Sequence, residues 1–118
     1  MLPNRTARLL AYEDAYSRSS FDIWFRQLEP IASAKVAVAL VRLECGHVSN
    51  VKSVGAGVHE LKVNYGPGYR VYFGKEGGAV IILLGGGTKK RQSADIRTAK
   101  LRWADYKARK RKGRVTCR

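Results

Sequence analysis

Charged and apolar residues alternate along two neighbouring segments of the chain. Residues 58–65 and 69–73 are predicted strands, and the Gly66–Gly68 stretch is predicted to form the turn between them. Side chains of a strand point alternately to its two faces. With Tyr65 opposite Tyr69, a hairpin places one polar set on one face, and in this register Lys62 faces Tyr72. The set, called the polar face below, comprises Glu60, Lys62, Arg70 and Tyr72.

The polar face has the composition needed to bind and cleave a phosphodiester. Two cations can bind a phosphate and stabilise the negative charge that develops during its cleavage. The ring of Tyr72 can stack on an unpaired base. Lys52, Lys89 and Lys90 lie at the ends of elements that border the same sheet, and they extend the cationic cluster. The alternative is that this face is open to solvent and that its carboxylate only pairs with a neighbouring cation.

Histidine and cysteine offer no competing chemistry. His47 falls in a predicted loop, and His59 falls on the apolar side of its strand, where a structural role is favoured over general-base catalysis. Cys45 and Cys117 have neither the CxxC spacing nor the neighbouring histidine of a metal site, so they are expected to be reduced thiols. The sequence therefore predicts no metal and no cofactor. Any cleavage would depend on Lys, Arg, Tyr and Glu side chains.

The charge of the chain indicates an anionic partner. The 118 residues include 23 Lys and Arg against 9 Asp and Glu, a net charge of +14. Of these, 13 basic and 2 acidic residues lie between Lys89 and Arg118. This balance excludes an acidic solvating protein and favours a polyanion such as nucleic acid. The C-terminal excess fits a catalytic surface, a nucleic-acid-binding arm or a solvated tail.

Hydrophobic periodicity predicts one small α+β domain. The expected elements are a short strand, two helices, four strands and a final helix, at residues 8–12, 20–29, 31–44, 51–54, 58–65, 69–73, 79–84 and 93–110. Pro30 separates the first two helices, and Gly85–Gly87 is expected to end the sheet. The predicted fold is a helical hairpin and a C-terminal helix packed on a mostly antiparallel sheet. It spans residues 1–108, and residues 109–118 form a basic, flexible tail.

No segment has the composition of a membrane anchor or a secretory signal. The longest apolar run, at residues 79–84, is far shorter than the ~20 residues that span a bilayer. The N-terminus has no apolar core of the kind found in signal peptides. A cytoplasmic protein without membrane contact is expected.

Several strings of residues together resemble one protein family. They are Trp24–Leu28, Lys52–Lys62, Tyr65–Phe73, Leu83–Lys89 with Gln92, and the stretch from Asp95 to Trp103. This set resembles the addiction-module killer branch of the RelE/ParE toxin superfamily, which is related to HigB-type toxins. The resemblance covers residues 18–106 and implies a RelE-like fold.

The resemblance also implies an activity and its residues. Such proteins are toxins of type II toxin–antitoxin modules, and many cut mRNA in the ribosomal A site. The 2′-hydroxyl of the mRNA attacks the adjacent phosphate, while basic side chains activate it and stabilise the charge. The residues implied as catalytic are Arg70, Lys52, Lys62, Lys89 and Glu60, the last as a base or as the residue that orients a cation. Those implied in nucleic-acid binding are Tyr72, Lys90 and Arg91.

Partners follow from the same resemblance. They are a helix-turn-helix antitoxin, the ribosome with its mRNA, and operator DNA only through the antitoxin. Thr88 stands where relatives usually carry Asp, so this chain lacks that carboxylate. ParE-like proteins share the fold and inhibit DNA gyrase, and a non-catalytic RNA-binding protein would also be basic, so both remain alternatives. The dense cationic face favours RNA cleavage.

Overall fold

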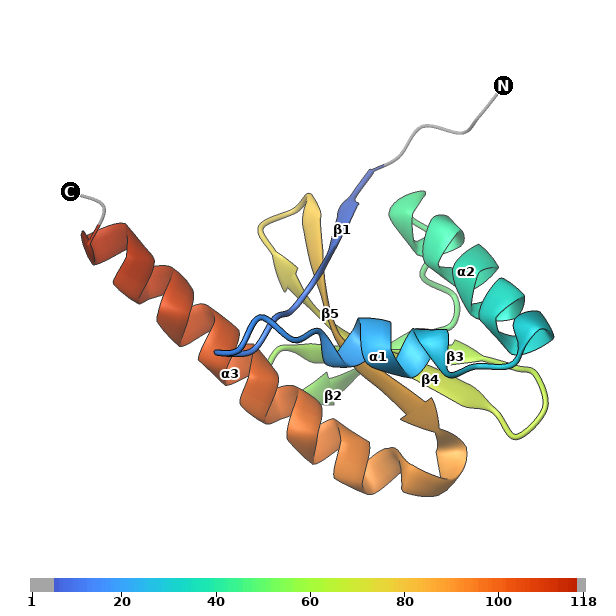
Figure 1. The fold of residues 1–118 in the computed structure, drawn as a ribbon. Helices are drawn as coiled ribbons and strands as arrows, with labels where there is room; N and C mark the ends of the chain where they lie inside the picture. The colour runs from blue at the N-terminus through green and yellow to red at the C-terminus, as the bar shows by residue number, and fades with distance from the viewer. Residues whose placement is uncertain (1–5, 117–118) are drawn as a thin grey trace.

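Five strands form one mixed sheet, and helices cover both of its faces (Figure 1). The structure is a computed structural model that describes residues 6–116. The strands are β1 Arg8–Ala11, β2 Val51–Gly55, β3 Val58–Val63, β4 Tyr69–Glu76 and β5 Val80–Thr88. Their order is β1-β5-β4-β3-β2, with β1 parallel to β5 and the other neighbours antiparallel. The prediction of a single α+β domain with a mostly antiparallel sheet is confirmed.

The helices are α1 Ser20–Arg26, α2 Pro30–Glu44, the short 3-10 helix η1 Lys89–Arg91 and α3 Gln92–Thr116. Helix α1 ends at Arg26, before its predicted end, because the residue that precedes Pro30 must be extended. That residue, Glu29, has φ −66° and ψ 159° and caps α2. Its carboxylate accepts hydrogen bonds from the backbone N–H groups of Ile31 and Ala32 at 3.2 and 2.6 Å. Pro30 therefore begins the second helix.

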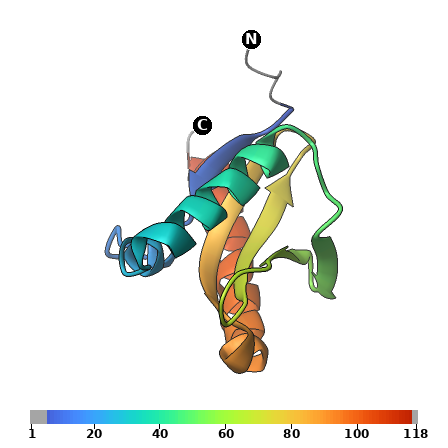
Figure 2. The ribbon, with the colours of Figure 1, turned by 90° about the vertical axis from the view of Figure 1, so that its right-hand side faces the viewer.

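Apolar side chains fill both sides of the sheet. Helices α1 and α2 cover one side, where the core includes Phe21, Val36, Leu61, Val71 and Phe73. Helix α3 covers the other side, where the core includes Tyr72, Ile82, Leu84, Ala99 and Trp103. Figure 2 shows β2, in green, at the outer edge of this arrangement. The polar face therefore lies on the α3 side of the sheet.

The glycine run Gly85–Gly87 belongs to β5 and does not end the sheet as predicted. Both helical layers pack on this bare backbone. A Cβ atom on Gly86 would overlap the indole ring of Trp24 in α1, and one on Gly87 would overlap the carboxylate of Asp95 in α3. These glycines permit the close approach of helix side chains to a strand. In the sequence, a glycine run with this role cannot be distinguished from one that forms a turn.

Strands β3 and β4 pair two residues away from the predicted register, with Lys62 opposite Arg70 rather than opposite Tyr72. The turn is longer than predicted and takes up residues 64–68. Gly66 there has a φ of 54°, a left-handed conformation that cannot continue a strand. Because the shift is an even number of residues, each side chain keeps its predicted face.

Helix α3 continues to Thr116, past the predicted end near Lys110, and includes most of the residues predicted to form a tail. Ala, Lys and Arg have high helix propensity, and Arg109 pairs with Asp105 one turn earlier, with Nη2 and Oδ2 2.8 Å apart. Figure 1 shows the C-terminal half of this helix projecting beyond the sheet. Residues 117–118 of the predicted tail, with Cys117, lie outside the described residues.

Candidate functional site

A buried carboxylate, that of Glu60 on β3, organises the polar face. Its side chain is only 2% exposed. Oε1 lies 3.7 Å from Nζ of Lys52 on β2 and 3.6 Å from Nε of Arg70 on β4. Oε2 accepts a hydrogen bond of 2.8 Å from Nε2 of Gln92, at the start of α3. One carboxylate therefore holds side chains from two neighbouring strands and a helix.

Arg70 is buried beside it, with a side chain 7% exposed. Its Nε atom has no hydrogen-bond partner among residues 6–116, because 3.6 Å to Glu60 is an ion-pair distance and too long for a hydrogen bond. A buried guanidinium is costly unless its N–H groups are paired. Nε itself is closed to solvent, but Arg70 also lines a pocket beside Glu60, where the guanidinium can donate to an additional acceptor such as a phosphate oxygen.

The polar face opens into a pocket of about 260 Å³, called the Glu60 pocket below. Its lining residues are Ser49, Asn50, Val51, Lys52, Glu60, Lys62 and Arg70. Four of the five predicted catalytic residues are thus brought together, and their side chains carry three positive charges against one negative charge. Lys62 is exposed and has no ion-pair partner in the described part of the chain. The pocket is small for a whole nucleotide and suits a phosphate with its adjoining sugar.

The fifth predicted catalytic residue, Lys89, lies at the margin of this pocket on η1. Its backbone N–H donates to the carbonyl of Gly68 at 3.1 Å. A Cβ atom on Gly68 would lie 3.4 Å from Nη1 of Arg70 and 3.6 Å from Cβ of Lys89. Lys90 is exposed on the same turn, whereas Arg91 lines a neighbouring pocket of about 220 Å³. The basic turn therefore borders the site without entering it.

Tyr72 does not suit the base-stacking role that the sequence predicts. Its side chain is 1% exposed and packs in the core beneath α3. Its hydroxyl has no hydrogen-bond partner among the described residues. Burial raises the pKa of this phenol, and the negative charge of Glu60 raises it further. Tyr72 is therefore a neutral phenol that is almost fully covered, and it contributes only to the lining of the neighbouring pocket that also contains Arg91.

Two residues of the site carried no role in the sequence-based prediction. Gln92 belongs to one of the strings that carry the family resemblance, and this was the one signal that could have marked it. Asn50 lines the Glu60 pocket, and its carbonyl accepts from the N–H of Lys62 at 2.9 Å. No periodicity marks Asn50, because it precedes β2 in a connecting segment.

His59 lies on the opposite side of the sheet from the site. Its ring stacks on Phe73 with centroids 5.3 Å apart and an interplanar angle of 22°. Burial lowers the pKa of this imidazole, and the positive charge of Lys75 lowers it further. His59 is thus a packing residue that is most stable when neutral.

This placement predicts a pH-dependent stability. The unfolded chain binds the His59 proton near its ordinary pKa of about 6.5, above the pKa in the folded state. The free energy of unfolding should therefore fall as the pH decreases below about 6.5, and the fall should end below the folded pKa. His59→Phe keeps the stack and should remove this part of the fall in urea titrations at about pH 7.5 and about pH 5.5. His47→Phe, at an exposed position, is the matched control. An unchanged pH response in His59→Phe would contradict the prediction.

Within residues 6–116, the helices are too short or too polar to cross a bilayer. In the same part of the chain, no three His, Cys, Asp or Glu side chains are grouped to hold a metal ion.

Fold and site together define an α+β domain with a cation-lined pocket around one buried carboxylate. The chain belongs to the Gp49-like phage-derived protein family, because the family model "Phage derived protein Gp49-like (DUF891)" matches residues 23–106. It is also similar to an uncharacterized protein of Haemophilus influenzae, with 42% identity over 83 residues, which are 70% of this chain and 84% of that protein. The predicted membership of the RelE/ParE superfamily is wrong, because the matching family is a different one.

Proposed function

We propose that this protein is the toxin of a toxin–antitoxin pair and cleaves mRNA on the ribosome. The observation that supports this is the Glu60 pocket, in which Lys52, Lys62 and Arg70 line a space that suits a phosphate with its adjoining sugar. RNA supplies its own nucleophile, the 2′-hydroxyl next to each phosphate. The protein needs only to align the two groups and to stabilise the charge between them.

In the proposed reaction, the 2′-oxygen forms a bond to phosphorus and the bond from phosphorus to the 5′-oxygen breaks. The products are a 2′,3′-cyclic phosphate and a 5′-hydroxyl end. Arg70 donates to the non-bridging oxygens as their negative charge increases. The proton of the 2′-hydroxyl passes to water as the 2′-oxygen attacks, and the ammonium group of Lys62 or Lys89 supplies a proton to the 5′-oxygen as its bond to phosphorus breaks.

Glu60 acts in this scheme as a positioning residue. Both of its oxygens are already engaged, by Arg70 and Lys52 at Oε1 and by Gln92 at Oε2. A carboxylate held in this way keeps the guanidinium facing the pocket and is poorly placed to accept a substrate proton. This favours the orienting role over the base role, two alternatives that the sequence left open.

The proposed function includes a cellular setting. The protein acts in the cytoplasm, where its net charge of +14 favours association with ribosomal RNA. A helix-turn-helix antitoxin covers the site and represses the shared operon, so operator DNA is reached only through that partner.

The test is a cleavage reaction with purified protein, ribosomes and a defined mRNA, read by primer extension. New ends with a 5′-hydroxyl and a 2′,3′-cyclic phosphate are expected. A message with a 2′-deoxynucleotide before the cut phosphate should stay intact at that position, because it lacks the nucleophile. Binding of RNA without cleavage would overturn the proposal in favour of a non-catalytic RNA-binding protein. In cells in which the protein is induced, growth arrest with an SOS response and intact mRNA would point instead to gyrase.

A further inference from the structure

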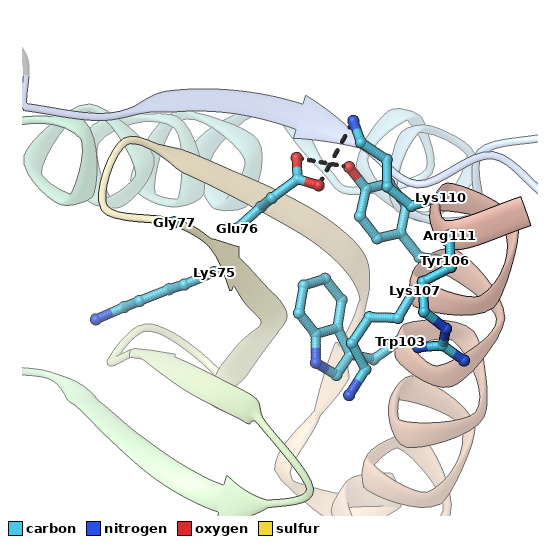
Figure 3. Close-up of a pocket in the computed structure, with 8 residues that line it drawn as sticks. All are labelled: Lys75, Glu76, Gly77, Trp103, Tyr106, Lys107, Lys110 and Arg111. Atoms are coloured by element: carbon cyan, nitrogen blue, oxygen red, sulfur yellow. Dashed lines mark hydrogen bonds and ion pairs between the residues drawn. The ribbon is translucent and has the colours of Figure 1, made fainter. Parts of the chain in front are cut away.

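A second basic pocket lies where the turn between β4 and β5 meets α3 (Figure 3). It has a volume of about 280 Å³ and is called the Tyr106 pocket below. Its lining residues are Lys75, Glu76, Gly77, Trp103, Tyr106, Lys107, Lys110 and Arg111. Figure 3 shows that Lys75 points away from the helix, so the cations of this pocket are those of α3.

Among the residues that the structure describes, Glu76 is the only carboxylate that lines the Tyr106 pocket, and it is already engaged. Glu76 accepts a hydrogen bond of 2.9 Å at Oε1 from the hydroxyl of Tyr106, and its Oε2 lies 3.5 Å from Nζ of Lys110. Lys107 and Arg111 are exposed and have no carboxylate partner in the described part of the chain. They lie four residues apart and so share a face of α3. The pocket therefore has uncompensated positive charge that suits an anion.

The aromatic side chains of this pocket are closed to stacking ligands. The rings of Trp103 and Tyr106 stack on each other, with centroids 5.5 Å apart and an interplanar angle of 6°. Trp103 is 5% exposed, and Nζ of Lys107 lies 5.6 Å from its ring centroid. Nζ of Lys110 lies 5.9 Å from the ring centroid of Tyr106. A base cannot insert here, so the fitting ligand is phosphate and not a nucleobase.

The fold sets the two pockets well apart and joins them by α3. Arg70 and Glu76 stand at opposite ends of β4, about 20 Å apart at the rise of a strand. Gln92 and Lys110 stand in the first turn and in the C-terminal half of α3, about 27 Å apart at the rise of a helix. A single RNA strand of several nucleotides can therefore contact both pockets by following the helix.

We propose that the Tyr106 pocket anchors the sugar-phosphate backbone of the RNA strand whose scissile phosphate lies in the Glu60 pocket. This inference rests on the proposed function. Exposed cations hold a lone phosphate weakly, but a strand already bound at one pocket reaches the second at high effective concentration. The contact is to backbone phosphates, so it adds affinity without sequence preference.

The test uses Lys107→Gln/Arg111→Gln and uncleavable RNA in which every 2′-hydroxyl is methylated. Dissociation constants are measured by fluorescence anisotropy over a range of salt, with strands of about 4 and about 16 nucleotides. For the long strand, the double variant should bind at least about 10-fold more weakly, and the slope of log K against log salt should fall by about 1.4. The short strand, held at the Glu60 pocket alone, should bind as before.

The matched control is Arg26→Gln/Arg42→Gln, which removes the same charge from α1 and α2 on the other side of the sheet. Equal weakening by both double variants would overturn the proposal, because net charge alone would then explain the effect. Equal weakening of short and long strands would also overturn it. Unchanged RNA binding by the Lys107→Gln/Arg111→Gln variant would overturn the proposal as well. This holds also if the variant loses the binding of an acidic protein, because the pocket would then serve that partner and not RNA. Failure of the proposed function would appear separately, as the absence of cleavage products in the reaction with ribosomes and mRNA. The binding experiment does not depend on cleavage, because its RNA cannot be cut.

Discussion

Arg70→Gln is expected to slow RNA cleavage by about 10²- to 10³-fold, the loss that follows removal of one preorganised donor to a developing oxyanion. The guanidinium lines the Glu60 pocket, where it can donate to a substrate oxygen. Glutamine retains a polar side chain there and removes the charge. The measurement is the single-turnover rate of mRNA cleavage at saturating protein, so that a change in ribosome binding does not enter.

Stability must be separated from chemistry in this variant. Loss of Arg70 leaves the buried Glu60 with fewer cations around it, which is expected to destabilise the fold by about 3 kcal/mol. The double variant Glu60→Gln/Arg70→Gln removes both charges and should recover part of that stability in urea titrations. Its cleavage should remain slow. If cleavage returned together with stability, Arg70 would be a structural residue and the assigned site would be wrong.

Gly86→Ala is expected to destabilise the protein by about 3 kcal/mol or more, although it adds only one methyl group. The new Cβ atom would overlap the indole of Trp24. That ring packs against Phe21 and Tyr69, with centroids 5.8 and 6.3 Å apart, so any movement that makes room for the methyl group disturbs these contacts. Chemical denaturation gives the free energy of unfolding directly.

Gly78→Ala provides the matched control for this substitution. Gly78 lies in the turn after β4 and is not in the left-handed region, and a Cβ atom there would meet no heavy atom within 4 Å. Alanine at this position should change stability by less than about 1 kcal/mol, in the stabilising direction, because it restricts the unfolded chain. If the two substitutions changed the free energy of unfolding by the same small amount, Trp24 would have moved aside at little cost. That result would contradict the packing argument.

The sequence predicted which residues share a face better than it predicted which residues are paired. Alternation with period two placed Glu60, Lys62 and Arg70 together, and that result survives a register shift of two residues. It also placed His59 on the other side, where the structure shows it stacked on Phe73. Local patterns of this kind depend only on backbone geometry, so a single sequence contains them.

What the sequence did not predict depends on contacts between distant segments. The burial of Tyr72 follows from the position of α3 over the sheet, and nothing in the strand itself indicates it. The role of Gly85–Gly87 depends in the same way on Trp24 and Asp95 from two different helices. The same glycines can form a turn or permit a close helix contact, and only the tertiary arrangement decides between the two.

The free side of β2 gives Lys52 a second physical role. In the described sheet β2 pairs only with β3, so its outer edge presents unpaired backbone groups. Such an edge can pair with another molecule and begin aggregation, and a charged side chain or a bulge opposes this. Strand β2 has both: Lys52, 66% exposed, and an irregular register between Ser53 and Gly55. An apolar substitution of Lys52 would therefore remove a cation from the pocket and also a barrier to self-association, whereas glutamine would keep the edge polar.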